Sequence, residues 1–408
     1  PNTDKVKENL DNLEQAISRK IIETHGTSLY LALDSIPNSE KQILNKEIGI
    51  QWRELIEKVN HKKRQKYRHD LVDRYEDFFT PSEIGADQTR DAITGEEIKD
   101  GDDWKYLDKS EESKIKQITS DQIELGRKLK KAQYWLTTNK ELEGLKGYDP
   151  AYLGVYHYFL TDDDLDDIDW YSIQNNPFNE LKLINKLDFY ERKVAKRDLK
   201  WGFEFYGGNN YPVFNENMVD QHGSVIHYAG DSKSYQYFGG ESNFQRIGML
   251  RMDIDNLGQI FINGFRDENR TYSRYSTLSR SLDYFFKGYI SKLWEKDDYN
   301  ECSSIIYAGG DDLFIVGKWD RMIQMAEEIK SAFKKWTCYN PNLTLSGGIS
   351  VVPVKFPVMR GAKEAGEEEE RAKHHHFMSN DNGRLEKSSF TLFKHALHWE
   401  KEYPVVKD

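Results

Sequence analysis

Two adjacent aspartates, Asp311 and Asp312, are the residues of this chain whose types and spacing most clearly suggest chemistry. Apolar runs flank the Gly-Gly-Asp-Asp sequence, so residues 305–316 are predicted to form a β-hairpin with the acids at its tip. Gly309 and Gly310 permit the positive φ angles that a tight hairpin turn needs. Neighbouring carboxylates repel one another, and a divalent cation such as Mg²⁺ or Mn²⁺ relieves that repulsion. The hairpin therefore predicts a metal site.

A second acidic segment precedes this hairpin in the chain. Residues 248–254 alternate as a strand does, and the chain then continues through Asp255 to a glycine turn. The order strand, acid, helix, hairpin and paired acids is that of palm-type nucleotidyl polymerases and cyclases, where two Mg²⁺ ions bridge carboxylates to a nucleotide triphosphate. Asp255 comes two residues after Asp253 and is not assigned a role. The expected catalytic residues are Asp253, Asp311 and Asp312, and the expected metal ligands are these three and Ile254.

Candidate nucleotide-binding residues surround the acids in the sequence. Backbone amides at 256–258 could cradle phosphates at the start of the next helix, although an ordinary turn explains the glycine equally well. Ser276 and Ser279 could read an adenine edge, although helix serines are more often solvated or bonded to their own backbone. Lys363 or Lys373 could neutralise a γ-phosphate, and the alternative is a solvated helix face. The expected set is Asn256, Leu257, Gly258, Ser279, Gly309, Gly310, Lys363 and Lys373.

Three further polar clusters are expected to have no chemical role. His374–His376 could chelate a metal ion, but adjacent histidines on one helix diverge, so this run is expected to be exposed. Glu367–Glu370 is likewise expected to be a solvated face. His69 and Asp70 form the sole His-Asp pair of the sequence and lie in a charged stretch without companion histidines. A surface pair is therefore expected there, and no DNA cleavage.

Composition and charge restrict the class of protein. The chain has 408 residues, 38% hydrophobic and 13% aromatic, enough for two or three domains with cores. A net charge of −11 argues against coating nucleic acid by charge alone, so RNA contacts are expected to be local or made through partner subunits. Cys302 and Cys338 are the only cysteines, which predicts a reducing compartment and no four-cysteine zinc site. No signal peptide or membrane span is evident, so a soluble cytoplasmic protein without membrane contacts is expected. The chain opens at Pro1 without Met, which predicts a fragment.

Apolar periodicity predicts an α+β chain. The elements expected in the first 240 residues are helix 4–22, strand 27–36, helix 39–66, a loop-rich insertion at 80–118, helix 121–135, strand 153–160, an acidic loop at 161–169 and a strand entering a glycine turn at 201–213. Those expected afterwards are strand 248–254, helix 276–294, the hairpin, helix 320–336, strand 343–352 and a charged helix from 359.

The second half of this order is βαββαβ, the ferredoxin-like arrangement with an antiparallel sheet and helices on one face. The early strand followed by a helix indicates a second, degenerate copy. We therefore expect two ferredoxin-like palm domains with a helical and loop insertion. The expected domains are the N-terminal part of the first palm (1–80), an insertion with a degenerate zinc element and a helix (81–140), the rest of that palm with a connecting region (141–240), and the second palm with the hairpin (241–400).

Several segments resemble the large polymerase-like, double-palm subunit of type III-A CRISPR effector complexes. The resemblance covers nearly the whole chain and is most specific after residue 248. The segments are Leu-Arg-Met-Asp-Ile-Asp-Asn-Leu-Gly (250–258), Tyr-Ser-Thr-Leu-Ser-Arg-Ser-Leu-Asp-Tyr-Phe-Phe-Lys-Gly-Tyr (275–289), Tyr-Ala-Gly-Gly-Asp-Asp-Leu-Phe-Ile-Val-Gly-Lys-Trp-Asp (307–320), Leu-Ser-Gly-Gly-Ile-Ser (345–350), Tyr-Leu-Ala-Leu-Asp-Ser (30–35), Leu-Gly-Arg-Lys-Leu-Lys-Lys-Ala (125–132) and Phe-Tyr-Gly-Gly-Asn (205–209).

This resemblance implies an activity and partners. It implies a Mg²⁺- or Mn²⁺-dependent nucleotidyltransferase that converts ATP to cyclic oligoadenylate, a second messenger, when an antiviral RNA-guided complex binds foreign RNA. The implied partners are ATP, other type III CRISPR effector subunits, including the small-subunit and crRNA-end-binding components, and crRNA and target RNA mainly through the complex.

The sequence departs from the family pattern in three respects. No N-terminal HD nuclease domain is expected in it, since His69-Asp70 is its sole His-Asp pair. Residues 87–95 and 116–120 match the flanks of a zinc element but contain no cysteine, so no structural zinc is expected. The family's C-terminal helical domain is likewise not expected in this sequence, which continues only briefly after the second palm.

Three alternatives remain open at this point. A nucleotide cyclase of the diguanylate or adenylate type shares the hairpin and fold, but it would lack the N-terminal half and usually needs a homodimer. A non-catalytic scaffold subunit of the RNA-guided complex is a second alternative, against which the intact acids argue. ATP could also be joined to another small acceptor.

Overall fold

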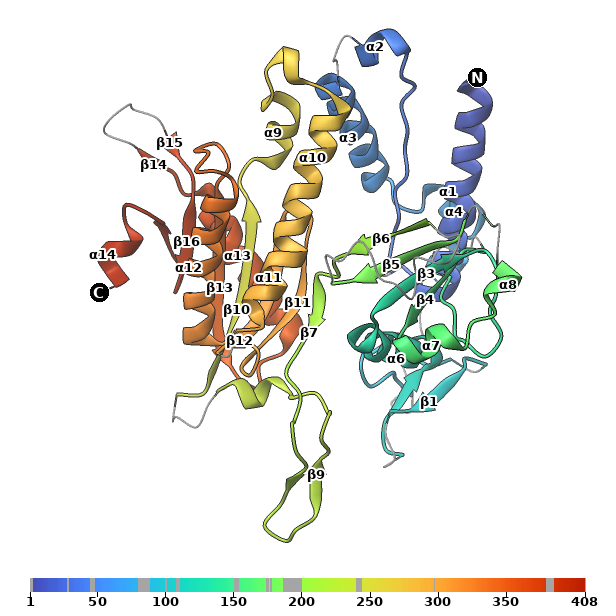
Figure 1. Cartoon of the computed structure of the whole chain (residues 1–408), viewed down its shortest axis with the longest axis vertical. Coiled ribbons are helices and arrows are strands. Elements are labelled where there is room, and N and C mark those ends of the chain that lie inside the picture. The colour runs from blue at the N-terminus through green and yellow to red at the C-terminus, as the bar shows by residue number, and fades with distance from the viewer. Residues whose placement is uncertain are drawn as a thin grey trace. The chain divides into compact units, whose positions relative to one another are not determined.

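The computed structural model separates into two compact units, each of which is described by itself (Figure 1). Unit 1 comprises Pro1–Glu204 with Arg266–Arg270, and unit 2 comprises Phe205–Phe265 with Thr271–Asp408. The residues described are 3–27, 29–44, 48–79, 89–99, 101–107, 111–149, 154–173, 176, 178–185, 200–239, 244–296, 298–378 and 385–407. The units divide nearer the N-terminus than the expected boundary at 240/241, because β7 (Gly208–Asn210) pairs with β11 (Ser303–Gly309) of unit 2.

Unit 2 is built on a seven-stranded sheet with the order β17-β16-β13-β10-β12-β11-β7. Its central strands are β10 (Arg246–Ile254), β12 (Asp312–Lys318) and β13 (Leu345–Pro353), and β10 lies antiparallel between the other two. Together with β11, they give the order β13-β10-β12-β11 and chain connections of a split βαβ unit. The predicted strands and hairpin of this half are therefore confirmed.

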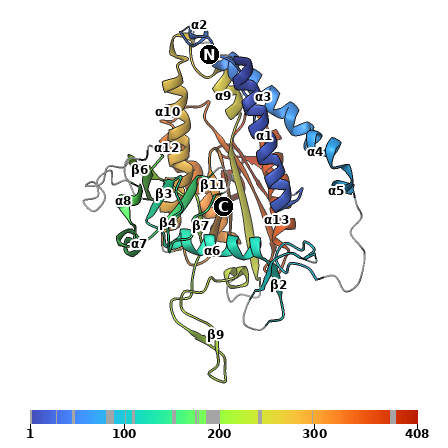
Figure 2. The same ribbon diagram turned by 90° about the vertical axis from the view of Figure 1, so that its right-hand side faces the viewer.

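Helices cover both faces of this sheet. One face carries the continuous helical stretch formed by α10 (Tyr272–Asp283), a π-helical segment (Tyr284–Tyr289) and α11 (Ile290–Trp294), together with α12 (Trp319–Trp336). The opposite face carries α13 (Val358–His374), as Figure 2 shows. The α+β palm architecture is confirmed: the helices of the βαββαβ unit lie on one face, and α13, which follows its last strand, covers the other.

Strand alternation on β10 explains the two covered faces. Leu250, Met252 and Ile254 belong to the core with α10–α12, whereas Met249 on the alternate side packs with Ala365 of α13. The approach of α13 requires glycine on the sheet: a Cβ at Gly348 would lie 2.4 Å from the backbone of Glu368. The Leu-Ser-Gly-Gly-Ile-Ser segment is thus a helix-packing site.

Apart from α9, whose start was expected at 256–258, sequence periodicity did not indicate the remaining short elements of unit 2. Two strands after α13 extend the sheet, with β16 parallel to β13 and β17 antiparallel to β16. The elements are β8 (Met218–Val219), β9 (Val225–His227), a 3₁₀ helix (Tyr235–Gly239), α9 (Leu257–Asn263), β14 (Phe377–Met378), β15 (Leu385–Glu386), β16 (Ser389–Leu392), β17 (His395–His398) and α14 (Tyr403–Lys407).

The N-terminal part of unit 1 is helical. The strand predicted at 27–36 is wrong, because the described part of this segment is held by side chains rather than by a ladder. The Tyr67 hydroxyl donates to the carbonyls of Thr27 (3.2 Å) and Leu29 (2.7 Å), and the Lys62 ammonium donates to the Leu33 carbonyl at 2.6 Å. The helices are α1 (Thr3–His25), α2 (Glu40–Leu44), α3 (Ile48–Arg64), α4 (Arg68–Asp73) and α5 (Tyr75–Phe79).

The rest of unit 1 contains a four-stranded sheet with the order β4-β3-β5-β6. Two local predictions are wrong here. The helix predicted to reach Trp135 ends at Lys131, since Trp135 lies in a strand with alternating burial. The acidic loop contains a helical turn that begins with a capping box between Thr161 and Asp164. The elements are β1 (Trp104–Tyr106), β2 (Lys114–Lys116), α6 (Gln117–Lys131), β3 (Tyr134–Thr138), β4 (Tyr156–Leu160), α7 (Asp162–Asp166), α8 (Trp170–Ile173), β5 (Glu180–Ile184) and β6 (Lys200–Glu204).

A search of the described residues finds no helix with both the length and the apolar character needed to cross a membrane.

Candidate active site

Strand register brings the predicted acids together at one end of the unit 2 sheet. Asp253 on β10 lies directly opposite Asp312 on β12, so both side chains lie on the same face of the sheet. The amide of Ile254 donates to the carbonyl of Asp311 at 3.1 Å, which fixes the hairpin turn beside the end of β10. Gly310 has a φ of +67°, as predicted for a tight turn. The backbone therefore places three carboxylates within one small region.

These carboxylates share an environment that disfavours their charge. Burial raises the pKa of Asp253 to about 6, and the nearby Asp311 and Glu369 carboxylates act in the same direction, against the ion pair with Lys373. Burial and the adjacent Asp312 likewise raise the pKa of Asp311. Additional positive charge at this place would stabilise the ionised carboxylates.

Two cations already lie among the acids. The Lys373 ammonium lies 2.7 Å from Asp253 Oδ2 and 3.0 Å from Glu369 Oε1. Burial alone would lower the pKa of Lys373, but these two carboxylates raise it, so the ammonium is charged at neutral pH. Arg251 Nη2 lies 3.9 Å from Asp312 Oδ2, and Arg251 Nε lies 3.4 Å from Glu369 Oε2.

Tyr307 on β11 orients one of the acids. Its hydroxyl donates to Asp312 Oδ2 at 3.0 Å and accepts from Arg251 Nη2 at 3.2 Å. Burial, with the Asp312 charge, raises the pKa of Tyr307 to about 12, so the phenol keeps its proton near neutral pH. Tyr307 therefore holds the Asp312 carboxylate in a fixed direction.

Asp255 serves a different purpose from Asp253. It is buried, and its Oδ2 accepts hydrogen bonds from Thr344 (2.7 Å) and Ser346 (3.0 Å). Its amide also donates to the Thr344 carbonyl at 2.9 Å. These contacts tie the end of β10 to β13, so Asp255 acts as a structural anchor.

The nucleotide-binding candidates at the start of α9 and on α10 have different local environments. Asn256 adopts the left-handed conformation before α9, and its side-chain oxygen accepts from Lys387 at 3.1 Å. A Cβ at Gly258 would meet nothing within 4 Å, so packing does not demand glycine there. Ser279, like Ser276, is exposed on α10. The roles proposed for all of these residues stay predictions.

The two lysine candidates are separated along α13. Lys363 is exposed and lies 3.9 Å from Glu367, whereas Lys373 contacts Asp253. Ten helical residues correspond to about 15 Å along the axis. The structure therefore brings only Lys373 to the carboxylates.

The prediction that Glu367–Glu370 forms a solvated face is wrong for Glu368 and Glu369, which are buried. The missed signal is a stripe of small residues on α13, because Gly361, Ala365 and Ala372 are also buried and recur at helical spacing. Glu369 lies on this packed side and contacts both cations of the site. Arg251 and Tyr307 were also missed, although both lie within the motifs that flank the acids.

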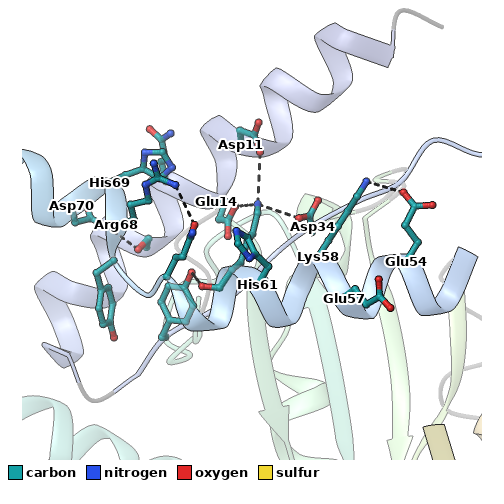
Figure 3. Close-up of a pocket in the computed structure, with 16 residues that line it drawn as sticks. Asp11, Glu14, Asp34, Glu54, Glu57, Lys58, His61, Arg68, His69 and Asp70 are labelled. Carbon is teal, nitrogen blue, oxygen red and sulfur yellow. Dashed lines mark hydrogen bonds and ion pairs between the residues drawn. The ribbon is translucent and has the colours of Figure 1, made fainter. Parts of the chain in front are cut away.

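His69 and Asp70 do not converge on a common point. Asp70 is buried and accepts from Ser18 at 3.1 Å, whereas His69 is exposed. Both line a cavity of about 630 Å³ between α1, α3 and α4 in unit 1 (Figure 3). Within this cavity Lys62 pairs with three acids. Those acids are Asp11, Glu14 and Asp34. The predicted exposed pair is thus correct for His69 only.

The run His374–His376 is also divided. His374 and His376 are exposed as predicted, whereas His375 is half-buried and its Nε2 lies 2.7 Å from Glu402. The cysteines Cys302 and Cys338 are both free thiols.

The donor set at the hairpin fits a divalent cation. Across the described stretches of the chain, no three His, Cys, Asp or Glu side chains are grouped to hold a metal ion as they lie, and at the hairpin Asp253 is bound to Lys373 instead. The raised pKa values of Asp253 and Asp311 nevertheless show carboxylates whose charge an added cation would stabilise. Carboxylate oxygens are the ligands that Mg²⁺ and Mn²⁺ prefer.

Two family descriptions match the sequence. Residues 246–380 match the second palm domain of Cas10/Cmr2, and residues 1–83 match domain B of the Csm1 subunit. The protein from Methanocaldococcus jannaschii named "CRISPR system single-strand-specific deoxyribonuclease Cas10/Csm1 (subtype III-A)" is 29% identical over 98% of this chain and 51% of its own length. The chain is similar to the subtype III-A Cas10/Csm1 proteins over nearly all of its length. An Enterococcus italicus protein of the same name is 42% identical over 34% of this chain and 17% of its own length.

Solved Csm1 structures share the fold. The apo Csm1–Csm4 cassette matches with a TM-score of 0.59 and 20% identity, over 95% of this chain and 44% of the other. A Csm1–Csm4 cassette in complex with one ATP gives a TM-score of 0.59 and 20% identity, over 95% and 45%. The chain thus spans about half the length of the Methanocaldococcus relative, and less than half of these solved chains.

Proposed function

We propose that this chain is the nucleotidyltransferase part of a type III-A CRISPR effector subunit and converts ATP to cyclic oligoadenylate. The observation that carries the proposal is the register of β10 and β12, which sets Asp253 opposite Asp312 and beside Asp311. Support comes from the Csm1–Csm4 cassettes of similar fold, which include complexes with ATP, pppApA, cA3 and cA4.

The residues suggest how the reaction proceeds. Mg²⁺ ions bound by Asp253, Asp311 and Asp312, with Ile254 as a further candidate ligand, would lower the pKa of an attacking 3′-hydroxyl and neutralise the triphosphate. Lys373, whose ammonium lies 2.7 Å from Asp253 Oδ2, offers its charge to a phosphate group.

The side chains around the acids orient rather than react. Tyr307 and Arg251 hold the Asp312 carboxylate in one direction. The amides at 256–258, with Gly309 and Gly310, remain the proposed phosphate contacts. Ser279 and Lys363 remain candidates for nucleotide binding, but both lie on exposed helix faces. No dedicated protein base is required, because positioning and charge neutralisation carry most of phosphoryl transfer.

The first test is the double variant Asp311→Ala/Asp312→Ala. We expect it to abolish product formation from ATP with Mg²⁺ or Mn²⁺ and to leave the fold intact, because the acids lie at a turn and not in a core. Chromatography of the products measures the first point, and circular dichroism the second. Undiminished product from the folded variant would contradict the assignment.

The relatives' printed name raises a second activity, cleavage of single-stranded DNA. Among the described residues, the His69–Asp70 pair is split between an exposed and a buried side chain, so it does not support a nuclease centre in this chain. Product chromatography also separates the remaining alternatives, because a nucleotide cyclase of the diguanylate or adenylate type, a scaffold and an enzyme with another acceptor would give different products or none.

Partners and location follow from the same proposal. We infer assembly with other type III effector subunits, since solved relatives of this fold are Csm1–Csm4 complexes. Contact with crRNA and target RNA would run mainly through these subunits, given the net charge of −11. Two free thiols fit a reducing, cytoplasmic location.

A further inference from the structure

Glu369 on α13 connects the two halves of the carboxylate site. Its side chain is 9% exposed, with Oε1 3.0 Å from Lys373 Nζ and Oε2 3.4 Å from Arg251 Nε. Each cation in turn reaches a different acid, since Lys373 lies 2.7 Å from Asp253 and Arg251 lies 3.9 Å from Asp312. One buried carboxylate therefore holds both cations, one on each oxygen.

We propose that Glu369 is a positioning residue that lets a divalent metal ion take Asp253 from Lys373, an inference that rests on the proposed function. A metal ion at Asp253 must displace the ammonium that now pairs with it. Glu369 offers that ammonium a second anion, so Lys373 can leave Asp253 without becoming a half-buried, unpaired charge.

Loss of the Glu369 charge affects metal binding in two ways that add. Lys373 would keep Asp253 as its one close carboxylate and would compete with the metal ion more strongly. The site would also lose one negative charge, which weakens its attraction for any cation. Both effects raise the metal concentration that half-fills the site.

The neighbouring Glu370 provides a matched control. It lies one residue further along α13, but its side chain is 64% exposed and pairs with His374 instead of the site cations. Glu370→Gln removes the same charge from the same helix without touching Lys373 or Arg251. Comparison of the two variants separates a contact within the site from a general change in helix charge.

Mn²⁺ binding to the full chain, measured from the free Mn²⁺ signal in electron paramagnetic resonance, tests the proposal without ATP. We expect Glu369→Gln to weaken Mn²⁺ binding by about tenfold, the range found for residues that support metal ligands. Glu370→Gln should bind as the wild type does. Equal Mn²⁺ affinity of Glu369→Gln and wild type, with circular dichroism unchanged, would overturn the proposal.

A double-mutant cycle with Lys373→Met asks whether Glu369 acts through the lysine. Removal of the competing ammonium should tighten Mn²⁺ binding, and Glu369→Gln should then cost less in the Lys373→Met background. An equal cost in both backgrounds overturns the proposal. If Glu369→Gln does not fold, the Lys373→Met variant alone tests the proposal. Mn²⁺ binding by Lys373→Met that is unchanged from or weaker than that of the wild type overturns the proposal.

The same Mn²⁺ measurement distinguishes a failure of the Glu369 role from a failure of the proposed nucleotidyltransferase activity. Asp311→Ala/Asp312→Ala should lose Mn²⁺ binding, and Mn²⁺ bound equally by this variant would refute the site and the role of Glu369 together. Normal Mn²⁺ binding with the expected Glu369 effect, but no nucleotide product in the assembled complex, would refute the nucleotidyltransferase alone and support the positioning role.

Discussion

Among single residues, Asp253 carries a charge that burial makes unfavourable. Its pKa of about 6 lies above the ordinary value, so the folded state binds a proton that the unfolded state has already released between about pH 4 and 6. Stability should therefore be highest at the acidic end of this window and fall as the pH rises through it. A shift of about two units corresponds to at most about 3 kcal/mol, and this shift already includes the opposing ion pair with Lys373.

We predict that Asp253→Asn removes this pH dependence. The amide carries no charge at any pH, so the variant's free energy of unfolding in EDTA should change less between pH 4.5 and 7 than that of the wild type. Urea denaturation followed by circular dichroism across this range measures the difference. Parallel curves for the two proteins would show that the Asp253 carboxylate is not the source of the dependence.

At the scale of elements, Asp91 links the two segments that match the flanks of a zinc element. It is buried, and its carboxylate accepts from the amides of Ile93 (2.8 Å), Thr94 (2.9 Å) and Lys116 (2.7 Å) and from the Thr119 hydroxyl (2.7 Å). Burial opposes ionisation, but these hydrogen bonds prevail and lower the pKa of Asp91 to about 2. A hydrogen-bonded carboxylate thus joins the segment around residue 91 to the start of α6.

We predict that Asp91→Ala destabilises unit 1 by about 3 kcal/mol, because three part-buried amides and the buried Thr119 hydroxyl lose their acceptor. Since the folded pKa is depressed, this contribution should be present above about pH 4 and lost as the pH falls towards 2. Thermal unfolding with and without a chelator is the measurement. The prediction fails if Asp91→Ala lowers the stability of unit 1 by less than about 0.5 kcal/mol. It also fails if the chelator lowers the stability of the wild type by as much as the substitution does.

Sequence reasoning succeeded where periodicity and local turn chemistry determine an element. The strands, the hairpin and the carboxylates of unit 2 follow from alternating apolar residues and the Gly309-Gly310 turn. It failed at 27–36, where a short apolar run is held by the side chains of Tyr67 and Lys62. It also missed Glu369, because a charged residue within a run of glutamates becomes buried only when α13 packs against Gly348.

At the scale of the whole chain, the net charge determines how the protein can bind RNA. The net charge of −11 opposes the approach of a polyanion, so the chain cannot rely on long-range attraction to collect RNA. The residues also span about half of the Methanocaldococcus relative's length. Under the proposed function, control by RNA is expected to depend on partner subunits that supply positive charge.

We predict that guide and target RNA alone change the ATP turnover of this chain by less than about twofold, because RNA binding through phosphates requires clustered Lys and Arg contacts. Addition of the partner subunits should raise turnover together with RNA affinity. Turnover and filter binding at low and moderate salt, with and without partners, measure both quantities. The Asp311→Ala/Asp312→Ala variant is the control, since it should bind partners and RNA normally but form no product. Strong stimulation by RNA without partner subunits would place the regulatory surface within these 408 residues. If added salt then weakened that stimulation, the RNA would be bound by a local basic site despite the negative net charge of the chain.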